Sequence, residues 1–268
     1  MEVALVYMVA GLSSRFGGKI KQFAKVGPDG ETLIEYSLKQ ALPAGFSKII
    51  FIVGDKTGPG FKEMFGKNYQ GLPVYYAYQK IGSDRDKPWG TTDSLVSASE
   101  LLDCPFVVCN GDDLYGSEPF KILVKHLRSS KEDATMGYKL GKVIPETGFV
   151  KRGIFQEENG YVKKLVETFN IAKNNLAVSN TKEDSLCSMN IFGLHLKTLS
   201  LLSKNLEKFK KEHEGDRIIE SLLPNDISLL LEAGKIKMKL YSTNAKWFGI
   251  TNPEDEENVR ESLKIQID

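Results

Sequence analysis

The stretch that decides the fold is VALVYMVAGLSSRFGGKIKQ, which covers residues 3–22. Its apolar part, Val3–Leu12, is far shorter than the ~20 residues needed to cross a bilayer. Only Met1 and Glu2 precede it, so it lacks the basic start of a signal peptide. Val3–Ala10 is therefore predicted to be a buried strand that opens the fold.

The residues after this strand combine small side chains, three glycines and basic groups. Small residues let backbone N–H groups approach an anion closely, and nearby cations neutralise its charge. A P-loop ending at Gly18-Lys19 would need glycine in place of Ser13 and a hydroxyl residue in place of Ile20. The dinucleotide-binding pattern would need glycines at Ser13 and Phe16. The loop fits neither pattern, yet its composition still indicates phosphate binding.

Outward from this loop, apolar strand-like runs alternate with helical patterns. This alternation, with nearly continuous apolar strands, predicts the α/β class: a three-layer α/β/α arrangement around a mostly parallel, Rossmann-like central sheet. Strands are expected at residues 3–10, 48–53, 73–79 and 105–109, and helices at 33–42 and 91–102.

The second half is less regular and predicts a smaller, mixed α+β part. Strands are expected at residues 134–140, 149–156, 161–167, 187–195 and 235–242, a loop at 168–185, and helices at 118–129, 196–212, 217–233 and 254–263. No clear linker or repeat occurs. One domain over residues 1–268 is therefore expected, with a nucleotide-binding half (1–116) and an acceptor-binding half (117–268) that includes a closing helix.

The composition is close to the globular average, with 41% hydrophobic and 26% charged residues. Thirty-six basic and 35 acidic residues leave a net charge of +1, which gives no support for nucleic-acid binding. Three cysteines are too few and too scattered for a disulfide framework or a cysteine-based zinc site, so a cytoplasmic location is expected. No membrane association is expected, and association into a homo-oligomer is left open.

Acidic residues follow another buried strand directly, in Val107-Val108-Cys109-Asn110-Gly111-Asp112-Asp113. Ligands of parallel sheets sit at the carboxyl ends of the strands. Mg²⁺ prefers one or two carboxylates together with phosphate oxygens and water. Asp112 is the candidate Mg²⁺ ligand, and Asp113 is either a supporting partner or a turn cap.

The first loop resembles the signature of the nucleotidyltransferases that make nucleotide-activated sugars and alcohols, the sugar-nucleotide pyrophosphorylase superfamily with a GT-A-like fold. The pattern A-G-x-x-[ST]-R followed by Lys matches a bacterial branch of it. The resemblance implies catalytic roles for Arg15 and Lys21, with Lys19 as a rival. It implies that nucleotide is bound by Ala10, Gly11, Leu12, Ser13 and Ser14.

Later segments extend the resemblance over most of the chain. Gln79 and Gly90-Thr91 occupy places similar to those where uridylyltransferases of this superfamily touch the base, and an amide can both donate to and accept from a pyrimidine edge. Asp112 matches the superfamily's Mg²⁺-binding aspartate. Gly148, Glu167 and Asn190 are expected to bind the acceptor.

The closing segment departs from the family pattern. In related cytidylyltransferases the second metal ligand is an aspartate, and Thr251 stands at that position here. Asp255 is the expected second ligand, with Asn252 or a water held by Thr251 as alternatives. Asp255 equally suits the first turn of a helix, where the helix dipole favours an acid.

The resemblance implies a Mg²⁺-dependent enzyme that joins a nucleoside triphosphate, favoured as a pyrimidine, to a phosphate-bearing acceptor such as a sugar 1-phosphate. Pyrophosphate is released. Three alternatives stay open: a GT-A glycosyltransferase using a nucleotide-sugar, a silent nucleotide-binding regulatory subunit, and a molybdopterin-modifying relative. A glycosyltransferase would need Asp112 but not the Arg15–Lys21 loop.

Overall fold

The computed structural model describes residues 1–11, 17, 19–145, 148–177, 180–250 and 255–264. Within these residues the helices are α1 (Leu33–Ala41), α2 (Gly58–Phe65), α3 (Thr91–Val96), α4 (Ser117–Ser129), α5 (Leu196–Glu212), α6 (Leu223–Glu232) and α7 (Asp255–Lys264). The strands are β1 (Ala4–Met8), β2 (Lys48–Val53), β3 (Asn68–Tyr69), β4 (Leu72–Tyr78), β5 (Phe106–Asn110), β6 (Asp113–Leu114), β7 (Asp133–Lys139), β8 (Val150–Glu158), β9 (Tyr161–Ile171), β10 (Leu186–Leu194), β11 (Met238–Thr243) and β12 (Phe248–Gly249).

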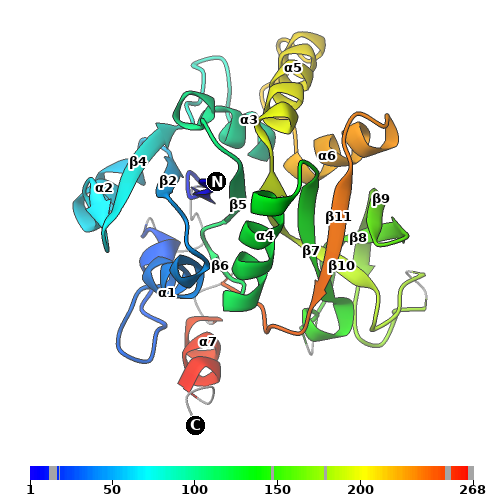
Figure 1. Cartoon of the computed structure of the whole chain (residues 1–268), viewed down its shortest axis with the longest axis horizontal. Helices are drawn as coiled ribbons and strands as arrows, with labels where there is room; N and C mark the ends of the chain where they lie inside the picture. Colours follow the sequence, from blue (N-terminus) through cyan, green and yellow to red (C-terminus); the bar gives the residue numbers. More distant parts are fainter. Residues whose placement is uncertain (12–16, 18, 146–147, 178–179, 251–254, 265–268) are drawn as a thin grey trace.

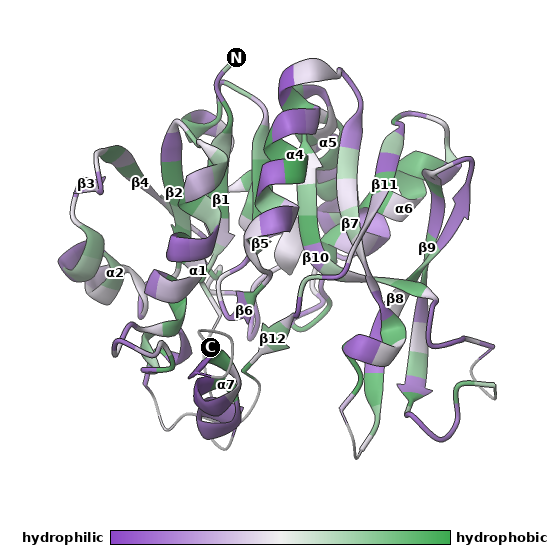
Figure 2. Ribbon diagram, turned by 60° about the horizontal axis from the view of Figure 1, so that its bottom comes forward, coloured by the Kyte–Doolittle hydropathy of each residue, from purple (hydrophilic) through white to green (hydrophobic). Residues whose placement is uncertain are grey.

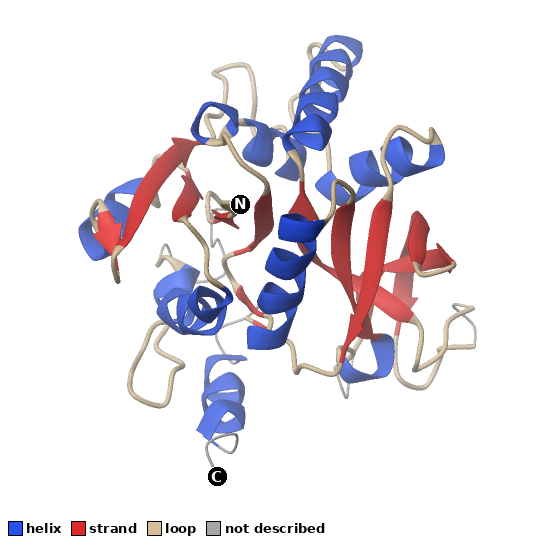
Figure 3. Ribbon diagram, in the orientation of Figure 1, coloured by secondary structure: helices blue, strands red, loops and turns tan. Residues whose placement is uncertain are grey.

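One large sheet runs through the molecule in the order β3-β4-β2-β1-β5-β10-β7-β11-β9-β8 (Figure 3). From β4 to β5 the pairs are parallel, as expected for the first half. The outer pair β3–β4 is antiparallel, and so are both pairs of β10, which lies between β5 and β7. The sheet is therefore mixed and not mostly parallel as predicted, because the second half adds its strands largely as antiparallel neighbours. The hairpin β8–β9 turns at Asn159-Gly160, both at positive φ, which is the backbone that a two-residue hairpin turn requires.

Helices cover both faces of the sheet and confirm the three-layer α/β/α architecture (Figure 1). Alternate residues of β1 point to opposite faces, because successive side chains of a strand do so. Leu5 and Tyr7 pack in the core under α1, α2 and α4, whereas Ala4 and Val6 pack in the core under α3, α5 and α6.

Two helices differ from the sequence-based prediction. Helix α2 was not expected, because Gly58, Pro59 and Gly60 are poor helix formers and mask the helical spacing of its apolar residues. Proline is tolerated in the first turn of a helix. The buried side chain of Phe61 packs α2 against the core. The helix expected over residues 217–233 begins only at Leu223. Its proline is again in the first turn, the position where a missing N–H costs nothing.

The terminal helix α7 covers a small separate core. Figure 2 shows it as a largely hydrophilic ribbon, and its Val259 and Leu263 are buried against Leu33, Leu114 and Ile250. Among the described residues, every helix is too short or too polar to span a membrane.

The start of α3 is fastened to the segment that precedes α6. Ser221 donates its N–H to the Trp89 carbonyl at 2.7 Å, and Thr92 donates its N–H to the Ser221 carbonyl at 3.1 Å. Gly90 lies between these contacts at φ +100°, and a Cβ there would come within 2.3 Å of the Ser221 carbonyl oxygen. Only glycine fits this close approach.

Gly90→Ala is therefore expected to lower the free energy of unfolding by at least about 3 kcal/mol, since it combines a left-handed backbone with a backbone clash. Gly215→Ala is the matched control, because Gly215 has φ +86° but open space around its Cβ direction. It is expected to cost about 1 kcal/mol. Urea unfolding of both variants measures the difference, and equal losses would contradict the clash at Gly90.

Candidate active site

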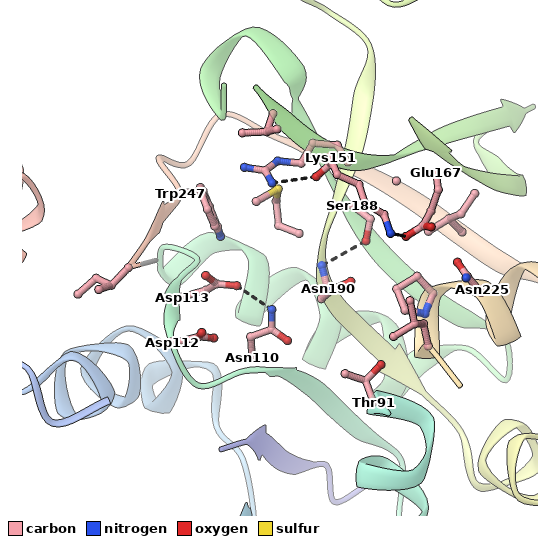
Figure 4. Close-up of a pocket in the computed structure, with 18 of the residues that line it drawn as sticks. Thr91, Asn110, Asp112, Asp113, Lys151, Glu167, Ser188, Asn190, Asn225 and Trp247 are labelled. Carbon is pink, nitrogen blue, oxygen red and sulfur yellow. Dashed lines mark hydrogen bonds and ion pairs between the residues drawn. The ribbon is translucent and has the colours of Figure 1, made fainter. Parts of the chain in front are cut away.

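A cavity of about 470 Å³ lies at the carboxyl end of β5, between the two halves of the chain (Figure 4). One wall carries Thr91, Asn110, Asp112 and Lys21, and the facing wall is formed by β8, β9 and β10 with the start of α6. Such a volume is typical of small-molecule sites.

A tight turn after β5 places the two aspartates. The Gly111 N–H donates to the Met8 carbonyl at 3.1 Å, and a Cβ at Gly111 would come within 2.2 Å of Val9. Glycine therefore lets the chain cross the end of β1 closely. Asp112 and Asp113 follow at once, and both line the cavity.

Asp113 is buried and held on several sides. Its Oδ2 accepts a hydrogen bond from Asn110 Nδ2 at 2.9 Å and lies 3.2 Å from the Tyr115 hydroxyl. Burial, and then the neighbouring charge of Asp112, raise its pKa to about 7, against the hydrogen bond from Asn110 and the charge of Lys21. Asp113 therefore keeps its proton to a higher pH than an exposed carboxyl group does.

Lys21 joins three distant segments at the cavity. It follows the first loop in a short 3-10 helix, Lys21–Phe23, and its Nζ forms an ion pair with Asp112 and donates to the Ile250 carbonyl. The rival Lys19 lines a different surface pocket with Glu256. The structure therefore brings Lys21, and not Lys19, to the predicted metal position.

The predicted base-binding residues lie together beside the cavity. Gln79 is buried at the end of β4, and its Nε2 donates to the Gly90 carbonyl and to Asp93 Oδ2, each at 2.9 Å. Thr91 lines the cavity, and its Oγ1 accepts the Leu223 N–H at 2.8 Å. Gln79 and Gly90 are not among the residues that line the cavity itself.

Most of the predicted nucleotide loop lies outside the described residues. Ala10 and Gly11 follow β1, and nothing lies within 4 Å of the Cβ direction of Gly11. The predicted Leu12, Ser13, Ser14 and Arg15 fall outside the described residues, as does Thr251. Their roles stay predictions.

Two of the three predicted acceptor residues line the far wall. Glu167 Oε1 pairs with Lys151 Nζ at 2.6 Å, and Figure 4 shows this pair across the cavity from Asp112. Asn190 lies in a bulge of β10 at φ +59°. Its backbone N–H donates a hydrogen bond to Ser188 Oγ at 3.2 Å. Gly148 is exposed and is not among the lining residues, whereas Gly153 is.

Asp255 begins α7, together with Glu256 and Glu257 in the first turn. It is not among the residues that line the cavity. Among the described residues, no group of three or more His, Cys, Asp or Glu could hold a metal by protein ligands alone. Asp112 therefore lines the cavity at the predicted position, and the metal-binding roles of Asp112 and Asp255 stay predictions.

Sequence reasoning missed several polar residues of the cavity, which are Asn110, Lys151, Arg152, Ser188, Asn225 and Trp247. The adjacent cations Lys151-Arg152 inside an expected strand were a usable signal, because an inner strand seldom carries charge without a partner. The sequence around Asn225 gave no such signal, because the position of Asn225 depends on where α6 begins.

Comparison with known proteins places the chain among nucleotide-transferring enzymes. A family model described as nucleotidyl transferase matches residues 18–253. A search of curated proteins returns no match.

Solved structures share the fold at low identity. The inositol-1-phosphate CTP transferase from T. maritima is similar with 14% identity and a TM-score of 0.70, covering 98% of this chain and 96% of that one. A UTP-bound UGPase from Acinetobacter baumannii is similar with 16% identity and a TM-score of 0.68, covering 99% and 94%. A UDP-glucose pyrophosphorylase complexed with UDP-glucose is similar with 16% identity and a TM-score of 0.68, covering 99% and 100%. The GT-A-like fold expected from the sequence is confirmed.

The raised pKa of Asp113 predicts how stability depends on pH. The unfolded chain ionises this carboxyl near its ordinary value of 3.8, whereas the folded chain holds the proton to about 7. Between these values the folded state binds more protons, so the free energy of unfolding falls as pH rises.

Asp113→Asn removes this dependence, so the wild type should lose stability relative to the variant between pH 4.5 and 8. Urea unfolding without divalent cations measures it. Parallel curves for the two proteins would contradict the raised pKa.

Proposed function

Because the chain belongs to the nucleotidyl transferase family, we propose that it transfers a nucleotidyl group from a nucleoside triphosphate to a phosphate-bearing acceptor such as a sugar 1-phosphate, with release of pyrophosphate. The observation that carries the proposal is the pair Lys21–Asp112, which faces the polar wall of Lys151, Glu167 and Asn190 across one cavity. One wall suits a metal-bound phosphate chain, and the other suits a hydroxyl-bearing acceptor.

The residues at the carboxyl end of β5 fit Mg²⁺. Asp112 offers a partly exposed carboxylate beside a second, buried carboxyl group, that of Asp113. Oxygen ligands of this type are those that Mg²⁺ prefers, with substrate phosphates and water completing its shell. When bound, the ion would supply charge neutralisation on the phosphate oxygens.

The reaction itself needs no protein nucleophile. An ionised oxygen of the acceptor phosphate forms a bond to the α-phosphorus, while the bond from that phosphorus to the oxygen bridging towards the β-phosphorus breaks. Pyrophosphate leaves with the electron pair. Catalysis is then positioning and charge stabilisation. We assign charge stabilisation on the leaving pyrophosphate to Arg15, and contact with the reacting phosphates to Lys21.

The described residues agree with this scheme. All three cysteines are buried and unpaired, and burial raises the pKa of Cys109 and Cys187, which disfavours thiolate nucleophiles. No histidine is among the residues that line the cavity. Free cysteines also support the cytoplasmic location that we propose.

Gln79 supports a pyrimidine base. The hydrogen bonds of Gln79 to Gly90 and Asp93 both use Nε2, so its carbonyl oxygen is the end that would accept an N–H from a base edge. The similar solved structures include a CTP transferase and a UTP-bound enzyme. We therefore propose UTP or CTP as the nucleotide donor.

Asp112→Asn is expected to lower turnover by about a hundredfold or more, because the site loses the charge that would hold the metal-bound phosphates. Arg15→Ala is expected to have an effect of similar size. Asp103→Asn is the control, since Asp103 is an exposed carboxylate paired with Lys48 away from the cavity. Steady-state rates and urea unfolding measure both effects. Turnover of Asp112→Asn close to that of the control would remove Asp112 from the mechanism.

The reverse reaction identifies the substrates. The enzyme, Mg²⁺ and pyrophosphate are incubated with UDP-, CDP-, dTDP-, GDP- and ADP-linked sugars and alcohols, and released nucleoside triphosphate is measured. A UDP- or CDP-linked compound is expected to react most strongly. Strongest release from a purine-linked compound would contradict the assignment of Gln79.

A further inference from the structure

Arg152 is a half-buried cation that forms no ion pair among the described residues. It lies on β8 in the cavity wall, where Nη1 donates to the Lys151 carbonyl at 3.0 Å and Nη2 to the Val143 carbonyl at 3.2 Å. A guanidinium has five N–H donors, and the one on Nε is buried with no acceptor in the part of the chain that the structure describes.

The other cations of the cavity differ from Arg152 in this respect. Lys21 pairs with Asp112, and Lys151 pairs with Glu167 at 2.6 Å. Arg152 has no ion pair among the described residues, and its burial lowers the pKa of the guanidinium. The charge of Asp113 acts on the guanidinium without forming an ion pair with it. A buried charge is costly unless an opposite charge is in contact with it, so Arg152 is suited to bind an anion.

Trp247 provides a second unsatisfied donor in the same wall. Its indole Nε1 is buried without a hydrogen-bond partner, and the Arg152 guanidinium lies 5.4 Å from its ring centroid. Both residues line the cavity. Buried polar groups in native proteins are nearly always hydrogen-bonded, so two neighbouring N–H groups without acceptors indicate a missing anionic or oxygen-rich ligand.

We propose that Arg152, supported by Trp247, binds the phosphate of the acceptor and selects for phosphate monoesters. This inference rests on the proposed function and names the acceptor subsite of the same cavity. The guanidinium fork matches two phosphate oxygens, which leaves the third for attack on the α-phosphorus.

The position of Arg152 places this subsite next to the predicted metal position. Arg152 comes from β8, whereas Lys21 and Asp112 come from the first half of the chain. Its guanidinium lies 5.4 Å from the Trp247 ring centroid, and Figure 4 shows Trp247 beside Asp113 and away from Glu167. A phosphate held there would lie close to phosphates bound at Asp112. Glu167 already neutralises the charge of Lys151. Arg152 is therefore the cation that would pair with the charge of the phosphate. Glu167, Asn190 and Asn225 are then available to the hydroxyl groups of the acceptor.

The test compares phosphate binding with nucleotide binding in variants of the full-length protein. Inorganic phosphate, glucose 1-phosphate, UTP and CTP are each titrated by calorimetry into wild type, Arg152→Gln, Arg152→Lys and Trp247→Phe. Lys163→Gln is the control, because Lys163 is an exposed cation on β9 outside this cavity.

We expect Arg152→Gln to weaken phosphate binding about tenfold or more, since it removes charge-assisted hydrogen bonds. Arg152→Lys keeps the positive charge but loses the paired N–H donors of the guanidinium, and Trp247→Phe loses the indole N–H donor. Each substitution should weaken phosphate binding several-fold. Affinity for UTP or CTP should change less than about twofold in all variants, as in Lys163→Gln.

Three results would overturn the proposal: no saturable phosphate binding by the wild type, unchanged phosphate affinity in the folded Arg152 and Trp247 variants, or an equal loss of nucleotide affinity. Calorimetric titration measures binding without turnover. The proposed phosphate site and the proposed reaction are therefore tested separately. Loss of phosphate binding in Arg152→Gln, together with an enzyme that is inactive with every tested nucleotide compound, would leave the anion site standing and refute the proposed reaction.

Discussion

The contact between Lys21 and Asp112 is the interaction on which the arrangement of the site depends. It joins the end of the first loop to the end of β5, and through the Ile250 carbonyl it reaches the segment before α7. These three segments are far apart in the sequence and meet only because β1 and β5 are neighbouring parallel strands. The sheet order therefore creates the charged edge, and the turn at Gly111 exposes Asp112 there.

Two groups of residues with different charge line the cavity. At the end of β5, two carboxyl groups lie close to one cation, which favours a bound metal ion. On β8 and just before β12, the Arg152 Nε–H and the Trp247 indole N–H have no acceptor among the described residues, which favours an anion. A metal-bound triphosphate and a phosphate monoester would satisfy both groups at once and would bring their reacting atoms together.

Local sequence was sufficient for the parallel strands of the first half and for placing Asp112 at the edge of the sheet. The strand before Asn110 and the strand before Ala10 are continuous apolar runs, and the polar residues after such strands meet at one edge. The acceptor wall could not be predicted as well. Gly153, which lies on β8, lines the cavity, whereas Gly148 precedes the strand and does not, and the sequence does not show where that strand begins. That a cation such as Arg152 lacks a partner is visible only in the tertiary structure, because every candidate partner is distant in sequence.

The most direct test of the account is a crystal structure with Mg²⁺, a non-hydrolysable analogue of the nucleotide that the enzyme uses, and inorganic phosphate. The account predicts that Asp112 coordinates the ion and that phosphate lies on Arg152. The α-phosphorus should lie between them. A nucleotide bound away from Asp112, or phosphate bound away from Arg152, would contradict it.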